Sequence, residues 1–159
     1  MVPPRSRVDL PWSKHLNREL EMIDINGMAH VILTVSQFEK AKSFYGQLLP
    51  GLGMKNVFDG SNLCYFVGAR TAVGIQPCAP EHAEERFVQN RVGLHHICLR
   101  ARSRQDVDVV ASLLREMDAT IVRGACEGHW APGYYYVLFE DPDGIRLDCV
   151  QSLLPEESA

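Results

Sequence analysis

The chain carries one short pattern twice, and this repeat limits its possible folds more than any other feature of the sequence. His30 begins the segment His-Val-Ile-Leu-Thr-Val, and His96, 66 residues later, begins the similar segment His-Ile-Cys-Leu-Arg-Ala. Runs of β-branched and aliphatic residues are typical of buried strands. Because a repeat at this spacing indicates one structural unit present twice, we expect two similar modules.

The same order of elements is expected after each copy of the pattern. Ser36 and Glu39 match a capping box, which predicts a helix that begins there and ends near residue 49. Ser103 and Asp106 match a second box at the corresponding place in the second copy. Apolar runs bounded by turn residues predict three strands after each helix, at about 54–58, 63–67 and 71–76, and near 120–123, 134–140 and 144–150.

Two β-α-β-β-β modules of this size predict an α+β fold. Neither module is expected to close a sheet of its own, so we expect the pair to form one curved, mostly antiparallel sheet with the helices outside. A chain of 159 residues has the length of a single domain. We expect an N-terminal arm at 1–24, one domain at 25–152 with modules at about 26–78 and 93–151, and a C-terminal tail at 153–159.

The composition limits the kinds of binding partner and the cellular location that we expect for this protein. The 16 Lys and Arg residues against 20 Asp and Glu residues give a net charge of −4, with no basic excess to bind nucleic acid or an anionic membrane. No apolar run approaches the ~20 residues that span a bilayer, and the first segment lacks the apolar run of a signal peptide. Five scattered cysteines fit free thiols in a reducing compartment. We therefore expect a cytoplasmic protein with a small-molecule substrate.

The matched histidines are the first candidates for chemistry. His30 and His96 lie on equivalent strands, so both can point into one cavity, and Asp148 lies on the last strand. Two imidazoles and a carboxylate can hold Fe(II), Mn(II) or related ions. Gln76 could add a neutral oxygen; the alternative for each residue is a structural, hydrogen-bonded role. His95 is expected to face the other way from its neighbour, as a structural or interface residue.

Two segments resemble a known superfamily. They are the opening Ala29-His30-Val-Ile-Leu-Thr-Val-Ser-Gln-Phe-Glu-Lys-Ala-Lys-Ser-Phe-Tyr45 and the closing Asp141-Pro-Asp-Gly-Ile-Arg-Leu-Asp148. With the paired modules they are similar to the vicinal-oxygen-chelate superfamily. That superfamily includes glyoxalase I, methylmalonyl-CoA epimerase, fosfomycin-resistance thiol transferases, extradiol dioxygenases and bleomycin-resistance proteins. The resemblance covers about residues 26–151.

The resemblance implies a glyoxalase-like fold and a set of metal ligands. The ligands it implies are His30, His96 and Asp148, where aspartate stands in place of the family's usual glutamate, with Gln76 as a fourth. The ion it implies is divalent: Fe, Ni, Zn or Mn. It also implies a homodimer, in which the modules of two chains can complete each site.

The loop at 123–133 carries further candidates. Its glycines suit a lid that closes on a small ligand, and a plain surface loop is the alternative. His129 lies 19 residues before Asp148 and resembles the second-sphere histidine of extradiol dioxygenases, whereas Leu138 replaces a tyrosine of that signature. We take Glu127, His129 and Tyr136 as the candidate catalytic residues.

Three functions remain open. The first is a divalent-metal-dependent enzyme, of lyase or isomerase type, that chelates two neighbouring oxygens of a small oxygen-rich substrate. The second is an Fe(II) extradiol-type dioxygenase. The third, from another class, is a metal-free protein of bleomycin-resistance type that sequesters a drug or other ligand. We expect an enzyme with a divalent metal ion as its cofactor.

Overall fold

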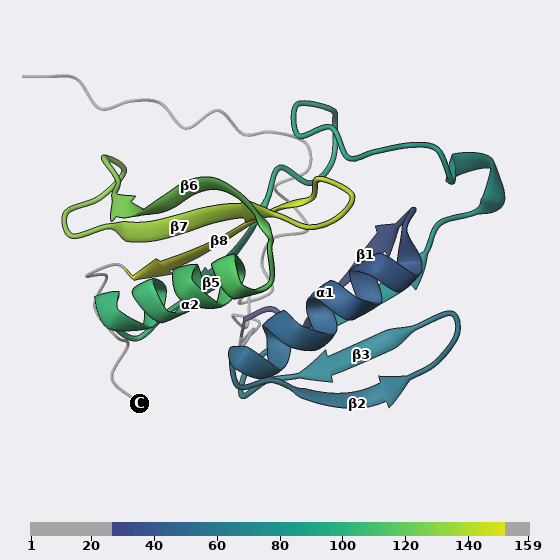
Figure 1. The fold of residues 1–159 in the computed structure, drawn as a ribbon, viewed down its shortest axis with the longest axis horizontal. Coiled ribbons are helices and arrows are strands. Elements are labelled where there is room, and N and C mark those ends of the chain that lie inside the picture. The colour runs from purple at the N-terminus through teal and green to yellow at the C-terminus, as the bar shows by residue number, and fades with distance from the viewer. Residues whose placement is uncertain (1–26, 152–159) are drawn as a thin grey trace, which may run out of the picture.

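Two modules with the same order of elements follow each other along the chain (Figure 1). The computed structural model describes residues 27–151, so the expected arm at 1–24 and tail at 153–159 lie outside the described residues. The first module contains β1 (His30–Val35), α1 (Phe38–Gly51), β2 (Lys55–Asp59), β3 (Cys64–Val67) and β4 (Ala72–Pro77), and a short 3-10 helix, η2 (Pro80–His82), follows it. The second module contains β5 (Ile97–Arg100), α2 (Arg104–Glu116), β6 (Thr120–Glu127), β7 (Tyr135–Glu140) and β8 (Arg146–Gln151).

Each module forms a four-stranded sheet of the same topology. The strand orders are β1-β4-β3-β2 and β5-β8-β7-β6. In both sheets the first and last strands of the module pair in parallel, and the other pairs are antiparallel. The predicted α+β fold of paired modules is confirmed. The strands divide into two hydrogen-bonded sheets, one for each module, where a single curved sheet was expected.

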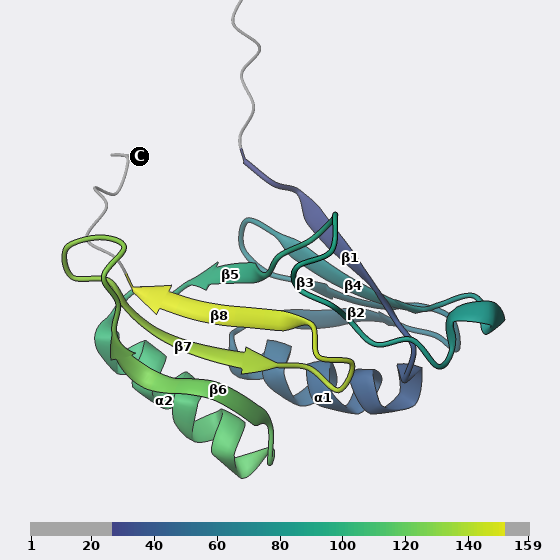
Figure 2. The same ribbon diagram turned by 90° about the horizontal axis from the view of Figure 1, so that it is seen from above.

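The two helices lie on the same side of the pair of sheets (Figure 2). Alternate strand residues such as Leu33 on β1 and Leu147 on β8 are buried together with the apolar stripes of α1 and α2 in one core that spans both modules. The opposite side of each sheet, which we call its open face, carries exposed side chains such as His30 on β1 and Cys98 on β5. Within residues 27–151, neither helix is long and apolar enough to cross a membrane.

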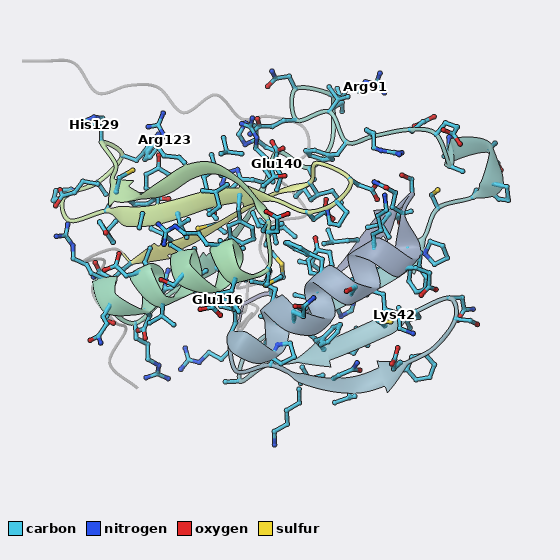
Figure 3. All side chains as sticks on the ribbon, in the orientation of Figure 1. Lys42, Arg91, Glu116, Arg123, His129 and Glu140 are labelled. Carbon is cyan, nitrogen blue, oxygen red and sulfur yellow. The ribbon has the colours of Figure 1, made fainter. Side chains whose placement is uncertain are left out.

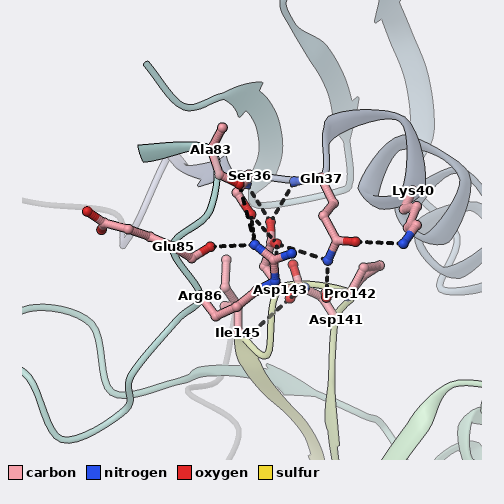
Figure 4. Close-up of polar contacts among 10 residues, drawn as sticks. All are labelled: Ser36, Gln37, Lys40, Ala83, Glu85, Arg86, Asp141, Pro142, Asp143 and Ile145. Carbon is pink, nitrogen blue, oxygen red and sulfur yellow. Dashed lines mark hydrogen bonds and ion pairs between the residues drawn. The ribbon is translucent and has the colours of Figure 1, made fainter. Parts of the chain in front are cut away.

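A carboxylate from the second module caps the helix of the first. The expected capping box at Ser36 and Glu39 is wrong, because the N-cap residue of α1 is Gln37 and no side chain of that segment caps it. Asp143, in the turn between β7 and β8, instead accepts hydrogen bonds from the backbone N–H groups of Ser36 (2.6 Å) and Gln37 (3.2 Å) (Figure 4). The Ser36 hydroxyl also donates to Asp143, at 2.7 Å. A carboxylate at this end of a helix is stabilising.

Asp141 fixes the same turn from inside. Its Oδ1 accepts the backbone N–H groups of Asp143 (2.9 Å) and Ile145 (2.8 Å), and Tyr45 of α1 donates its hydroxyl to Oδ2 at 3.0 Å. Burial raises the pKa of Asp141 to about 6, although these hydrogen bonds oppose the rise. For Asp143, burial also acts to raise the pKa, but the hydrogen bonds from Ser36 and Gln37 outweigh it and the pKa is lowered. The Asp-Pro-Asp-Gly turn thus ties the two modules together.

Candidate functional site

Asp148 lies on the open face of the second sheet with one carboxylate oxygen unpaired. It stands between Cys98 on β5 and Leu138 on β7, and it is only 5% exposed. Its Oδ1 is buried and has no hydrogen-bond partner among the described residues. Since a buried polar atom without a partner costs about 1–3 kcal/mol, and more when it is charged, this oxygen indicates a place where a cation or a hydrogen-bond donor binds.

His96 lies directly beside this carboxylate. Its Nε2 is 3.9 Å from Oδ2 of Asp148, and its Nδ1 is 2.7 Å from Nδ1 of His95. The rings of His95 and His96 meet edge to face, with centroids 4.9 Å apart. The expectation that His95 faces the other way is therefore wrong. The strict alternation of a strand does not apply to these residues, because β5 begins only at Ile97.

Two further polar groups surround Asp148. The hydroxyl of Tyr134 donates to its Oδ2 at 3.5 Å. Desolvation, and then the nearby Cys98 and Asp148, raise the pKa of Tyr134. Desolvation, followed by a hydrogen bond to Asp148, raises the pKa of the Cys98 thiol to about 12. Both groups therefore stay protonated near neutral pH and can donate hydrogen bonds at this site.

Three aromatic side chains form a wall beside Asp148. The ring centroids of Trp130, Tyr134 and Tyr136 lie between 5.2 and 5.5 Å apart. Tyr136, a predicted catalytic residue, is only 3% exposed, whereas Trp130 is 69% exposed. Gly128 allows the Trp130 ring to fold back onto the chain, since a Cβ at Gly128 would lie 2.6 Å from that ring. Tyr134 was not among the predicted catalytic residues, although it shares with Tyr136 the alternation that indicates the open face.

His30 and Gln76 lie on the open face of the other sheet. His30 is exposed at the start of β1 and meets the ring of Tyr65 edge to face, with centroids 6.4 Å apart. Gln76 lies opposite Thr34, to which it donates at 3.1 Å, four positions or roughly 13 Å farther along the ladder than His30. In residues 27–151 no group of three or more His, Cys, Asp or Glu side chains has the spacing of a metal site. One chain therefore brings together only two of the four predicted ligands, His96 and Asp148.

The register shows which residue of the first module corresponds to Asp148. Asp148 lies opposite the second residue after its module's histidine, and Gly74, opposite Ile32, takes the same place in the first module. A Cβ at Gly74 would lie 2.3 Å from Cδ1 of Ile32 and 3.0 Å from the ring of Tyr65, so neighbouring side chains fill this position. Gln76 stands two residues beyond it. The first module therefore has no acidic side chain at this position.

Glu127 lies on the side of the sheet that faces α2, whereas His129 is exposed on a loop. Glu127 is opposite Tyr135 in the β6–β7 ladder and forms an ion pair with Arg104 of α2. Because Tyr135 also donates to Asp108 of α2, this part of the ladder faces the helix, and the Glu127 carboxylate points away from the open face. His129 is exposed on the loop that joins β6 and β7 (Figure 3).

Comparison with known proteins identifies the family. The model of the Glyoxalase/Bleomycin resistance protein/Dioxygenase superfamily matches residues 27–148. The chain belongs to this superfamily. The resemblance seen in the sequence is therefore confirmed. The chain is also 29% identical over 124 residues to the uncharacterized protein YqjT of Bacillus subtilis (strain 168), a match that covers 77% of this chain and 97% of YqjT.

Solved structures of this superfamily share the fold. A glyoxalase-like protein from Bacillus halodurans superposes with a TM-score of 0.68 at 25% identity, over 79% of this chain and 95% of that protein. A glyoxylase/bleomycin resistance protein/dioxygenase domain from Frankia sp. EAN1pec gives a TM-score of 0.66 at 21% identity, over 81% and 99% of the two chains. Lactoylglutathione lyase from Agrobacterium tumefaciens gives 0.58 at 18% identity, over 79% and 93%.

Proposed function

We propose that this superfamily member is a divalent-metal-dependent enzyme that acts on a small oxygen-rich substrate by a lyase or isomerase reaction. The observation that carries the proposal is the unpaired, buried Oδ1 of Asp148 next to the imidazole of His96. Carboxylate and imidazole are ligand types that Fe, Ni, Zn and Mn accept. Membership of a superfamily that generally uses divalent metals supports the same conclusion.

A homodimer would complete this half-site. His96 and Asp148 are two ligands, whereas catalytic metal sites of this kind usually have three or more protein ligands. His30 would supply the third if the first module of a second copy faces the second module, whereas Gln76 lies too far along the ladder from His30 to bind the same ion. Exposed apolar groups on the open face of the first sheet, such as Ile32 at 39% exposure, support an interface there. We therefore propose one site at each contact between unlike modules.

The side chains around Asp148 have distinct roles in this proposal. A divalent ion bound there would polarise two neighbouring oxygens of the substrate and stabilise the anion formed when a proton leaves. Tyr134 donates its hydroxyl to Asp148 and so orients this carboxylate, and the aromatic wall would exclude water from one side. His129 is the proposed base, because Glu127 is held by Arg104 on the helix side of the sheet.

Metal analysis of protein purified without chelators tests the proposal. Wild-type protein should retain a divalent ion, and His96→Ala and Asp148→Asn should lose it. His82→Ala is the matched control, because His82 is an exposed histidine on η2 that pairs with Glu85. Wild-type protein that is empty and also refuses added Ni, Zn, Mn and Fe would contradict the metal enzyme and favour the ligand-sequestering alternative.

Oxygen uptake separates the proposed reaction from ring cleavage by a dioxygenase. Protein reconstituted anaerobically with Fe(II) is exposed to oxygen in the presence of a panel of catechols. We expect no uptake, in keeping with Leu138 in place of the signature tyrosine. Uptake on any catechol that His96→Ala abolishes would replace the lyase or isomerase proposal with extradiol dioxygenase activity.

A cytoplasmic location is part of the proposal. All five cysteines lie in the described residues, and all are free thiols. Free thiols persist in reducing compartments, which supports this location.

A further inference from the structure

The hydrogen bonds around His95 determine where His96 carries its proton. The two Nδ1 atoms are 2.7 Å apart, so one must carry a hydrogen and the other must accept it. The amide nitrogen of Gln89 lies 3.2 Å from the same Nδ1 of His95. With the Gln89 amide oriented so that its nitrogen faces His95, Nδ1 of His95 is an acceptor, because an amide nitrogen only donates. This orientation assigns the hydrogen between the two rings to Nδ1 of His96.

The other ring nitrogen of His96, Nε2, then carries no hydrogen. A neutral imidazole has one N–H group, so Nε2 of His96 presents a lone pair. This atom is the one that lies 3.9 Å from Oδ2 of Asp148, itself an acceptor. Two acceptors that face each other across this distance, beside the unpaired Oδ1, suit a cation between them. In the opposite tautomer, Nε2 would point its hydrogen at Asp148 and compete with a metal ion.

We propose that His95, oriented by Gln89, is a positioning residue that holds His96 in the tautomer ready to bind a divalent metal ion. This inference rests on the proposed metal centre. The hydrogen bond to the second ring nitrogen of a ligating histidine fixes both the tautomer and the direction of the ring, and its loss typically lowers metal affinity by about 10–100-fold. Here the partner is a second imidazole, whose acceptor role depends on Gln89.

Three variants separate this role from a merely structural one. His95→Phe keeps a flat ring but has no acceptor. His95→Asn keeps an acceptor oxygen close to the position of Nδ1 and should rescue the wild-type behaviour. Gln89→Glu replaces the donor with an acceptor, so Nδ1 of His95 must then donate and the tautomer of His96 should reverse. Because Gln89, His95 and His96 lie outside the buried core, all three variants should fold.

The first readout is the nitrogen NMR spectrum of the His96 ring in metal-free protein, which reports directly which nitrogen carries the hydrogen. We expect Nδ1–H in wild-type protein and in His95→Asn, and Nε2–H or a mixture in His95→Phe and Gln89→Glu. The second readout is the affinity for Zn²⁺, measured by competition with a chromophoric chelator. His95→Phe should lose roughly 10–100-fold, and His95→Asn should keep most of the wild-type affinity.

The outcomes distinguish this inference from the proposed function. The role of His95 would be overturned if the wild-type spectrum shows Nε2–H on His96. It would also be overturned if His95→Phe changes neither the tautomer of His96 nor the affinity for Zn²⁺. Wild-type protein that refuses Zn²⁺ would overturn the metal enzyme instead. A tautomer that still follows His95 in such protein would uphold only the part of the inference that His95 fixes the tautomer of His96.

Discussion

The charged side chain of Asp148 should lower the stability of the metal-free protein, and Asp148→Asn tests this. The change keeps the shape of the side chain and removes a charge from a residue that is 5% exposed and has an unpaired Oδ1. Asparagine still places a polar atom at the position of Oδ1, so the relief comes from removing the buried charge, whose unpaired desolvation costs at least about 1–3 kcal/mol. In chelator near neutral pH we expect the free energy of unfolding to rise by that amount, which for a chain of this size raises Tm by roughly 2–4 °C per kcal/mol.

Added metal should reverse the order of the two proteins. An ion that binds only the folded state stabilises it by about 2.7 kcal/mol at 100 times its Kd. Wild-type protein should gain this stabilisation in Zn²⁺, whereas Asp148→Asn, which lacks the charged ligand, should gain much less. Glu84→Gln removes one carboxylate charge from an exposed site after η2 and is the control, with an expected change within about 0.5 kcal/mol.

Thermal unfolding followed by circular dichroism, with chelator and with Zn²⁺, measures both effects. A loss of stability of Asp148→Asn in chelator would refute the reasoning, since it would mean that the carboxylate makes favourable contacts in the metal-free fold. An equal gain of both proteins in Zn²⁺ would refute the role of Asp148 as a ligand.

The turn between β7 and β8 gives two further predictions. Tyr45→Phe removes the hydroxyl that donates to Asp141, and we expect a loss of about 1.5–3 kcal/mol when Asp141 is charged but only about 0.5–1.5 kcal/mol when it is neutral. Burial raises the pKa of Asp141 to about 6, so its contribution to stability is present below its unfolded pKa and is lost as the pH rises through 6. Urea unfolding should therefore show that Tyr45→Phe lowers the free energy of unfolding more at pH ~7.5 than at pH ~5. Equal losses at the two pH values would contradict this. Tyr65→Phe is the control, and its effect should not depend on pH in this range. Asp143→Ala removes the cap of α1, and in the same assay it should lower the free energy of unfolding by about 2–3 kcal/mol, against less than about 1 kcal/mol for Ser36→Ala. The pKa of Asp143 is lowered in the folded protein, so its contribution to stability is present at neutral pH and is lost as the pH falls through its folded pKa.

The fold could be predicted where short-range patterns determine it. The capping box at Ser103 is confirmed, since its side chain accepts from the backbone N–H of Asp106 at 3.1 Å. The box at Ser36 is wrong because Asp143, 107 positions away, caps the helix instead, and no local pattern reports such a partner. The strand expected at 120–123 extends to residue 127. The sequence pattern ended too early because the pairing of this strand shifts register, which breaks the alternation of apolar and polar residues that marks a strand.

The candidate site was predictable where the repeat and the alternation of strands determine it. These two patterns placed His96 and Asp148 on one face, and the structure brings their side chains within 3.9 Å. The direction of His95 depends on where the ladder of β5 begins, and the role of Gly74 depends on the strand register. The sequence reports neither. The role of Tyr134 was open to prediction from its alternation with Tyr136.

The two modules share a fold but divide the chemistry unequally. The second module carries the imidazole of His96 beside the buried carboxylate of Asp148, whereas the first carries His30 and, at the position of Asp148, Gly74. A site built from one module of each kind would thus surround a divalent ion with a single negative charge. The net positive charge left on the ion would favour substrates that are anionic or become so during reaction. The glycine at this position of the first module would therefore affect the substrate class of such a site as well as its metal affinity.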